Sequence, residues 1–197
     1  SKNIELFYET NNGKMNFLNL KDENKNLMYV YENEKFKSIL LKEVKRNKIK
    51  NIKKEIKNLE LIKSYDLTIL CLGGNSRIYN KIGNNRAIKK DYEEIAITGH
   101  VKHKIKNIKT SQFFLKEGPL AILPFDKNKF SFVWSLSNKF YKNNSKKIEN
   151  LVNEKIKKIF DIKNNIKVSN LQSFPIQLNL KRKYYDKNIL ILGEGLH

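Results

Sequence analysis

The sequence predicts an α/β sheet that is interrupted by an inserted α+β module. Two observations lead to this fold class. The apolar runs 66–72 (DLTILCL) and 189–192 (ILIL) are each typical of a buried strand, and each passes directly into a glycine turn. Between them, several short stretches of 92–136 alternate apolar and polar residues, which is typical of an antiparallel meander. The predicted order is α/β sheet, inserted module and return to the first sheet.

The segment before the first buried strand contains a hairpin and a helix. Residues 6–20 alternate weakly around Asn11-Asn12-Gly13, which favours a hairpin turn. Apolar residues then recur at helical spacing with lysines between them, so we expect an amphipathic helix over 34–46 with Asn33 as its N-cap. After the strand at 66–72 we expect a glycine turn and a short helix over 77–82.

The inserted module is rich in residues that favour strands. We expect strands over 92–103, 110–116, 120–125 and 130–136, the last with its aromatic residues and Leu136 on one face. An amphipathic helix begins near Ser145. Residues 168–176 contain Pro175, which cannot donate to a strand ladder, so this strand is expected at a sheet edge.

The charge of the chain is strongly positive, with a formal net charge of +20 over 197 residues. Phosphate or base recognition favours the bidentate guanidinium of arginine, but the basic residues are 36 lysines and only four arginines, spread from Lys2 to Lys187. A high content of lysine, asparagine and isoleucine is the composition bias that an AT-rich genome produces. A solvated surface is therefore the better interpretation, and nucleic-acid binding stays a less favoured alternative.

The number of cysteines and the length of the apolar runs both bear on the cellular location of the protein. Cys71 is the only cysteine, which excludes an intrachain disulfide and a thiolate zinc site. The longest apolar runs are far shorter than the roughly 20 residues of a membrane-spanning helix, and no leader opens the chain. We expect a reducing, cytoplasmic setting.

The two glycine turns are the candidate binding elements. Glycine allows a backbone to approach a phosphate or ribose closely, and N–H groups at a following helix start favour an anion. Gly73-Gly74-Asn75-Ser76 is better explained by a plain tight turn with a helix cap, and the nucleotide interpretation gains weight only from the second turn at Gly193 and Gly195.

Other chemistry-bearing residues favour structural roles. His100 and His103 fall three apart in an extended stretch, so we expect exposed histidines on opposite faces and no shared metal site. Asp91, Glu93 and Glu94 are expected in a solvated turn. Ser76 lacks the glycine pattern of a nucleophile elbow. Trp134 is expected in the core rather than on a stacking platform.

Three stretches, in order, resemble the FAD-dependent aromatic hydroxylases, most closely the ubiquinone-biosynthesis branch that contains 2-octaprenyl-6-methoxyphenol hydroxylase. Residues 72–77 (LGGNSR) resemble the family's Asp-Gly-any-Asn-Ser-Arg turn. Residues 118–124 (GPLAILP), followed by 132–136 (FVWSL), are similar to strands of the substrate domain, and 193–197 (GEGLH) stands where the family has Gly-Asp-Ala-Ala-His. Tyr31-Glu-Asn33 and the helix after it resemble the segment that passes the adenosine of the flavin.

This resemblance implies a p-hydroxybenzoate-hydroxylase-like fold that is incomplete at both ends. Residues 1–90 would be part of an FAD-binding α/β domain, 91–180 an α+β substrate domain with a mixed sheet, and 181–197 the return strand. The flavin, reduced by NADPH or NADH, would hydroxylate an aromatic ubiquinone precursor through a flavin hydroperoxide, so no catalytic side chain and no metal is implied. The implied FAD contacts are Gly73, Gly74, Asn75, Ser76, Arg77, Gly193, Glu194 and His197.

The chain departs from the family's pattern at several positions. Leu72 and Glu194 stand where the family has aspartates, and Glu34 stands where an arginine faces the flavin. An N-terminal glycine fingerprint for the pyrophosphate has no counterpart in the sequence. We therefore expect a fragment or truncated member that binds FAD weakly or not at all. The alternative is a cofactor-less, lysine-rich binding or assembly protein that retains the fold. Hydrophobic quinone precursors would further imply peripheral contact with the inner membrane.

Overall fold

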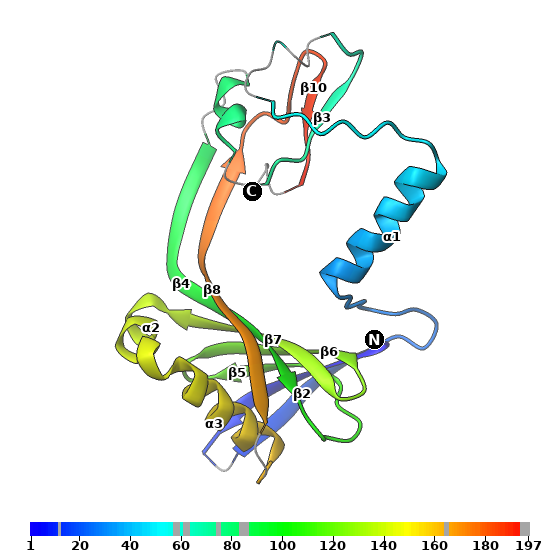
Figure 1. Cartoon of the computed structure of the whole chain (residues 1–197). Helices are drawn as coiled ribbons and strands as arrows, with labels where there is room; N and C mark the ends of the chain where they lie inside the picture. Colours follow the sequence, from blue (N-terminus) through cyan, green and yellow to red (C-terminus); the bar gives the residue numbers. More distant parts are fainter. Residues whose placement is uncertain are drawn as a thin grey trace. The chain divides into compact units, whose positions relative to one another are not determined.

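The computed structural model describes residues 1–11, 13–56, 60, 64–73, 76–82, 87–163 and 166–193. The chain divides into two compact units, one made of 1–47 and 93–176 and the other of 48–92 and 177–197. The helices and strands, labelled in Figure 1, are β1 (Asn3–Thr10), β2 (Gly13–Lys21), α1 (Asn33–Arg46), β3 (Thr68–Leu70), η2 (Arg77–Lys81), β4 (Ala87–Lys102), β5 (Thr110–Leu115), β6 (Gly118–Asp126), β7 (Lys129–Ser137), α2 (Asn138–Asn144), η3 (Ser145–Lys147), α3 (Ile148–Phe160), β8 (Lys167–Lys181), β9 (Tyr185–Asp186) and β10 (Ile189–Ile191).

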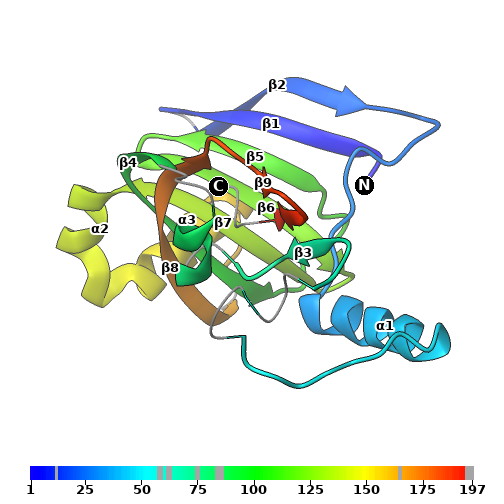
Figure 2. The same ribbon diagram turned by 90° about the horizontal axis from the view of Figure 1, so that it is seen from above.

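The first unit is built on a mixed sheet with the strand order β2-β1-β5-β6-β7-β4-β8 (Figure 2). The strands β5, β6, β7 and β4 form the antiparallel meander that the alternation predicts, and β8 lies at the sheet edge as Pro175 predicts. The hairpin of β1 and β2 is also confirmed. It joins the meander through a parallel pairing of β1 with β5, in which Ile4 is opposite Thr110.

The N-terminal hairpin and α1 belong to the first unit, in which residues 1–47 group with 93–176. The reason is the β1–β5 pairing, which joins residues about a hundred positions apart and leaves no local sequence signal. Within the described residues, the α/β part of the chain is reduced to the small second unit.

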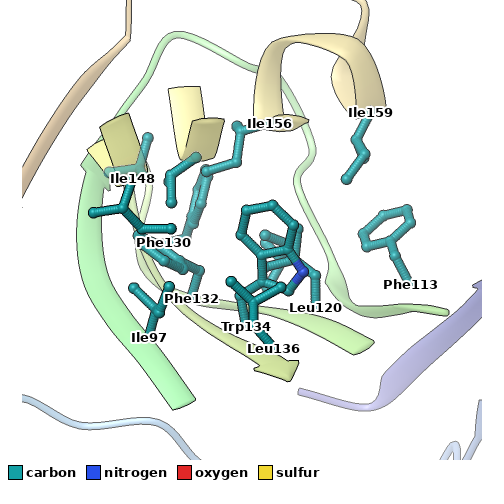
Figure 3. Close-up of a cluster of buried hydrophobic side chains, with 13 residues drawn as sticks. Ile97, Phe113, Leu120, Phe130, Phe132, Trp134, Leu136, Ile148, Ile156 and Ile159 are labelled. Carbon is teal, nitrogen blue, oxygen red and sulfur yellow. The ribbon is translucent and has the colours of Figure 1, made fainter. Parts of the chain in front are cut away.

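Helix α3 covers one face of the large sheet and closes its hydrophobic core (Figure 3). The strand β7 contributes alternate residues, so Phe130, Phe132, Trp134 and Leu136 all face the helix and are at most 1% exposed. Helix α3 contributes Ile148, Val152, Ile156 and Ile159 to the same core. Trp134 is a core residue as expected, and its indole Nε1 donates to the Gly118 carbonyl at 3.2 Å.

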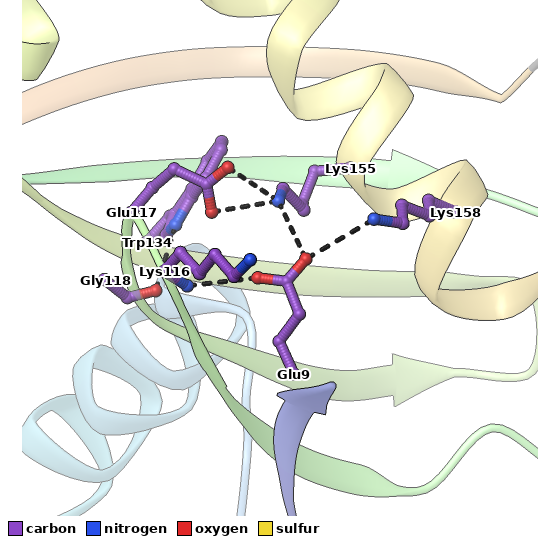
Figure 4. A network of polar contacts seen from close by, with 7 residues as sticks. All are labelled: Glu9, Lys116, Glu117, Gly118, Trp134, Lys155 and Lys158. Carbon is purple, nitrogen blue, oxygen red and sulfur yellow. Dashed lines mark hydrogen bonds and ion pairs between the residues drawn. The ribbon is translucent and has the colours of Figure 1, made fainter. Parts of the chain in front are cut away.

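Charged residues fasten the N-terminal hairpin to α3 (Figure 4). Lys155 Nζ donates to both carboxylate oxygens of Glu117 at 2.8 and 2.9 Å and lies 3.5 Å from Glu9 Oε1. The backbone N–H of Lys116 donates to the other oxygen of Glu9 at 3.1 Å. Lys14 of β2 donates to the carbonyl of Ile159 in the last turn of α3 at 2.7 Å, where a positive charge is favourable next to the helix C-terminus.

The second unit contains a three-stranded sheet with the order β3-β10-β9. Strands β3 and β10 are parallel, with Thr68 opposite Ile189 and Leu70 opposite Ile191. Its small core contains Leu70, Tyr79, Ile82, Ile189 and Ile191. The two apolar runs that predict a common sheet are therefore neighbouring strands.

Three local predictions are corrected by the structure. The N-cap of α1 is Glu32 rather than Asn33, and its side chain makes no capping hydrogen bond. The helix expected over 77–82 is a 3-10 helix. A separate short helix, α2, precedes the predicted one and is capped by the Ser137 hydroxyl, which accepts from the Phe140 N–H. Among the described residues, no helix is long and apolar enough to cross a bilayer.

Candidate functional site

The glycine turns of the second unit follow the carboxyl ends of two adjacent parallel strands. Gly73 comes after β3 and Gly193 after β10, and both have φ near +73°. The Leu192 N–H donates to the Leu70 carbonyl at 3.0 Å, which extends the pairing up to the turns. Two left-handed glycines thus lie at the same end of one small parallel sheet, where ligands of open α/β sheets bind.

Tyr79 holds the backbone just before the first turn in place. Its ring is 1% exposed, and its hydroxyl accepts a hydrogen bond from the Leu72 N–H at 2.8 Å. Ser76 begins the 3-10 helix, and its side chain accepts from the Ile78 N–H. Both contacts lie within the second unit and flank the turn.

The space around the two glycines suits the close approach of another molecule. A Cβ atom built on Gly73 or on Gly193 would meet no described atom within 4 Å. This open backbone fits a ribose or phosphate group. The side chain of Leu72 next to it is 42% exposed and has no hydrogen-bonding atoms, so the described part of the turn offers backbone groups rather than a carboxylate.

Only part of the predicted FAD contact set can be located. Gly73, Ser76, Arg77 and Gly193 are described, and all belong to the second unit. The other predicted contacts, together with the glycine of the second turn, lie outside the described residues: Gly74, Asn75, Glu194, Gly195 and His197.

The first unit carries a second candidate site on the sheet face opposite α3. In the part of the sheet formed by β6, β7 and β4, the register brings small residues together on this face. They are Ala96, Thr98, Ala121, Ser131, Val133 and Ser135. None of these side chains is fully buried, because the helices that complete the core lie on the other face.

A hollow of about 770 Å³ lies on this open face. His100 and Ser131 line its floor, Phe125 and Leu123 supply apolar surface, and residues 30–34 before and at the start of α1 complete it. The His100 ring lies 3.4 Å from the Asn170 amide and 5.4 Å, between ring centroids, from Phe125. A half-buried imidazole next to an aromatic ring can hydrogen-bond a phenolic hydroxyl while the rings are in contact.

The two histidines do lie on opposite faces of the sheet, but neither is exposed, since His100 is half-buried and His103 is buried. His103 is 4% exposed, and its ring lies 5.1 Å from the ring of Phe130, so the expectation of an exposed histidine is wrong there. The strand ends at Lys102, and the His103 N–H donates to the Asn128 carbonyl at 2.9 Å, which turns the side chain inward.

The acidic cluster lies in strand β4 rather than in a turn. Asp91, Glu93 and Glu94 are exposed as expected, and Asp91 accepts from the Gln177 amide at 3.4 Å. Across the described residues, no group of three or more histidines, cysteines, aspartates and glutamates has an arrangement suited to a metal ion.

Known structures give the clearest comparison, because no protein-family model and no curated protein sequence matches the chain. The whole chain superposes on the flavin-dependent halogenase CmlS with a TM-score of 0.69 and 11% identity, and covers 41% of that protein. It superposes on the myxobacterial FAD-dependent halogenase CndH with a TM-score of 0.71 and 9% identity, covering 53%. It has part of the fold of flavin-dependent halogenases and monooxygenases.

The shared fold covers about half of these relatives' length. The flavin-dependent monooxygenase PieE, solved with FAD and substrate, is matched by 66% of this chain, which covers 24% of PieE at a TM-score of 0.54 and 8% identity. The flavoprotein fold is thus shared with halogenases as well as monooxygenases, and none of these matches singles out the ubiquinone branch.

Sequence reasoning missed one exposed feature of the first unit. Tyr8, Phe17 and Phe114 form a ring cluster on the open face, with Phe17 lying 5.7 Å from Tyr8 and 5.9 Å from Phe114 between centroids. Each ring is at least 36% exposed. Phe17 is the extra residue of a β-bulge in β2, opposite Leu6 and Phe7 of β1. The bulge breaks the alternation of apolar and polar residues that would have shown which face of the sheet Phe17 lies on.

The buried histidine predicts an acid-sensitive fold. Burial lowers the pKa of His103 below its ordinary value of 6.5, so the folded state keeps the ring neutral while the unfolded chain takes up a proton. The contribution of the neutral His103 ring to the free energy of unfolding is therefore present above about pH 6.5 and is lost as the pH falls through the folded-state pKa.

Urea unfolding at pH 7.5 and 5.5 should give a lower free energy of unfolding at pH 5.5. His103→Gln should flatten this step, whereas His100→Gln should retain it; an unchanged step in His103→Gln would contradict the assignment.

Proposed function

We propose that the chain is part of an FAD-dependent monooxygenase that hydroxylates an aromatic precursor of ubiquinone. The observation that carries the proposal is the pair of left-handed glycines, Gly73 and Gly193, side by side at the carboxyl end of a parallel strand pair. The superposition on flavin-dependent enzymes supports it, because it extends over the entire chain.

The flavin would contact the backbone at these turns. Gly73 to Arg77 and Gly193 to His197 are the two segments that we assign to it, with backbone N–H groups as donors to its ribose and phosphate oxygens. Bound FAD, reduced by NADPH or NADH, supplies the oxygen chemistry. The chain's own task is to hold the cofactor and to orient an electron-rich ring.

The substrate ring would occupy the hollow on the open face of the large sheet. Its volume of about 770 Å³ is within the range of small-molecule sites, and it combines apolar walls with a few polar groups. His100 is the residue that we assign to the phenolic hydroxyl, with Phe125 against the ring. An apolar isoprenoid tail would favour peripheral contact of the whole enzyme with a membrane, which the basic surface would assist.

Titration of the chain with FAD tests the flavin assignment. We expect saturable quenching of flavin fluorescence with a Kd of about 0.1 mM. Gly73→Ala and Gly193→Ala should each weaken binding tenfold or more, because alanine is strained at φ near +73° and shifts the backbone. Gly13→Ala, in the first unit and also at positive φ, is the matched control. No quenching and no heat at 1 mM FAD would contradict a flavin site in this chain.

A cofactor-less binding protein is the second candidate. It is favoured by the exposed apolar side chain of Leu72 beside the first turn and by the net charge of +20. This candidate predicts salt-sensitive association with an acidic partner or an anionic membrane surface in the absence of FAD. Cosedimentation with phosphatidylserine vesicles at 50 and 500 mM salt tests it, and a flat salt response would contradict it. A gel shift at physiological salt tests the remaining alternative, nucleic-acid binding.

A further inference from the structure

A second hollow of about 900 Å³ lies in the first unit, where β4 ends and α3 leads into β8. None of its residues belongs to the segments that resemble the flavin site, and the hollow is separate from the His100 site apart from Lys102 and Lys167. Its apolar wall is formed by Ile105, Phe160, Ile162 and Ile166.

The rim of this hollow is basic. Lys102, Lys104, Lys163 and Lys167 contribute to its lining and are exposed, whereas Asp161 is the one acidic residue among the lining residues. Four lysines of eleven lining residues is about twice the lysine frequency of the whole chain. The rim of the hollow therefore carries mainly positive charge.

His103 supplies a polar group to the wall that has no partner. The Ile105 N–H donates to His103 Nδ1 at 3.0 Å, so the ring carries its proton on Nε2. Nε2 has no hydrogen-bond acceptor among the described residues, and it is buried. A buried donor without an acceptor is unfavourable, and because His103 lines the hollow, a turn of its ring toward the hollow would let an oxygen bound there accept from Nε2.

We propose that this hollow binds a small amphipathic carboxylate, with the acid group among the lysines and near His103 and the hydrocarbon on the isoleucine wall. The combination of an apolar wall, a cationic rim and a buried donor matches a carboxylate on an apolar body better than a free inorganic anion, which would leave the wall unused. This inference is independent of flavin binding.

Decanoate below its micelle-forming concentration is the probe, and calorimetry on the full chain is the measurement. We expect saturable 1:1 binding that is at least tenfold tighter than binding of decanol or acetate and that weakens when salt is raised from 50 to 500 mM. Equal affinity for decanoate and decanol would overturn the proposal. So would association with phosphatidylserine vesicles but not with monomeric decanoate, since the basic rim would then be a membrane contact.

Two double variants separate the site from general charge. Lys104→Gln with Lys163→Gln should raise the Kd for decanoate about fivefold or more. Lys142→Gln with Lys146→Gln removes the same charge from exposed positions near α2 and should leave the Kd unchanged. Nitrogen-15 spectra of the histidine rings supply a local readout that requires no histidine variant: the His103 Nε2 signal should shift with the binding isotherm and the His100 signals should not. An equal loss of affinity for decanoate in both double variants, or a His103 Nε2 signal that does not shift, would overturn the proposal.

Discussion

Replacing Gly118 by alanine should unfold the first unit or lower its free energy of unfolding by about 4 kcal/mol. Gly118 begins β6 at φ +137°, and an added Cβ would lie 2.0 Å from the backbone oxygen of Ser135 in β7. That oxygen belongs to the paired sheet and cannot move aside as a flexible side chain would. The shift would also disturb the Gly118 carbonyl, which accepts from the buried indole of Trp134.

Gly13→Ala is the control that separates backbone strain from collision. Gly13 has a similar φ of +131°, but a Cβ there would meet no described atom within 4 Å. It should therefore cost only the strain, about 1 kcal/mol. Urea unfolding followed by the fluorescence of Trp134, the only tryptophan, measures both variants. Equal effects of the two substitutions would show that the β6–β7 approach is looser than the structure has it.

Replacing Lys155 by methionine should destabilise the first unit by about 3 kcal/mol. The Lys155 side chain is 12% exposed, and it binds Glu117 through both carboxylate oxygens and lies 3.5 Å from Glu9. Methionine retains the length of the side chain but leaves Glu117 without its lysine and Glu9 with Lys158 alone. Lys158→Met is the matched control three residues along the same helix, because Lys158 is 67% exposed and should contribute about 0.5 kcal/mol or less.

Acidification should reduce the difference between wild type and Lys155→Met. The pKa of Glu9 is lowered, chiefly by the hydrogen bond from the Lys116 N–H and also by the charges of Lys155 and Lys158, against a raising effect of burial. The carboxylate therefore stabilises the fold fully above its ordinary value of 4.5, and this contribution is lost as the pH falls through the lowered folded-state pKa. Denaturation curves at pH 7 and at about pH 3 would reveal it. A difference that stays constant over this range would contradict a role for the ionised Glu9.

Features that depend on neighbouring residues could be predicted from the sequence. The alternation in 130–136 predicts both the strand β7 and the buried face on which Trp134 lies, because successive side chains of a strand point to opposite faces. The glycine turns after β3 and β10 were predictable for the same reason. The sequence predicts that both strands belong to one sheet, whereas their direct parallel pairing is a finding of the structure.

Features set by distant contacts could not be predicted. The hairpin of β1 and β2 belongs to the large sheet only because β1 pairs with β5, and nothing near Ile4 indicates Thr110. Burial of His103 follows from a bond between its N–H and the Asn128 carbonyl of another turn. The hollow beside His100 likewise combines residues 30–34 with strands 70 to 140 positions further along.

The parallel pairing of β1 with β5 also imposes an order of events on synthesis. The first strand leaves the ribosome about a hundred residues before the segment that it pairs with, a delay of several seconds at about 5–20 residues per second. During that interval the hairpin has no sheet to join, although it carries the exposed rings of Tyr8 and Phe17. Closing the intervening loop comes late and costs chain entropy. The nascent protein should therefore be most vulnerable to aggregation and proteolysis until Thr110–Leu115 has emerged.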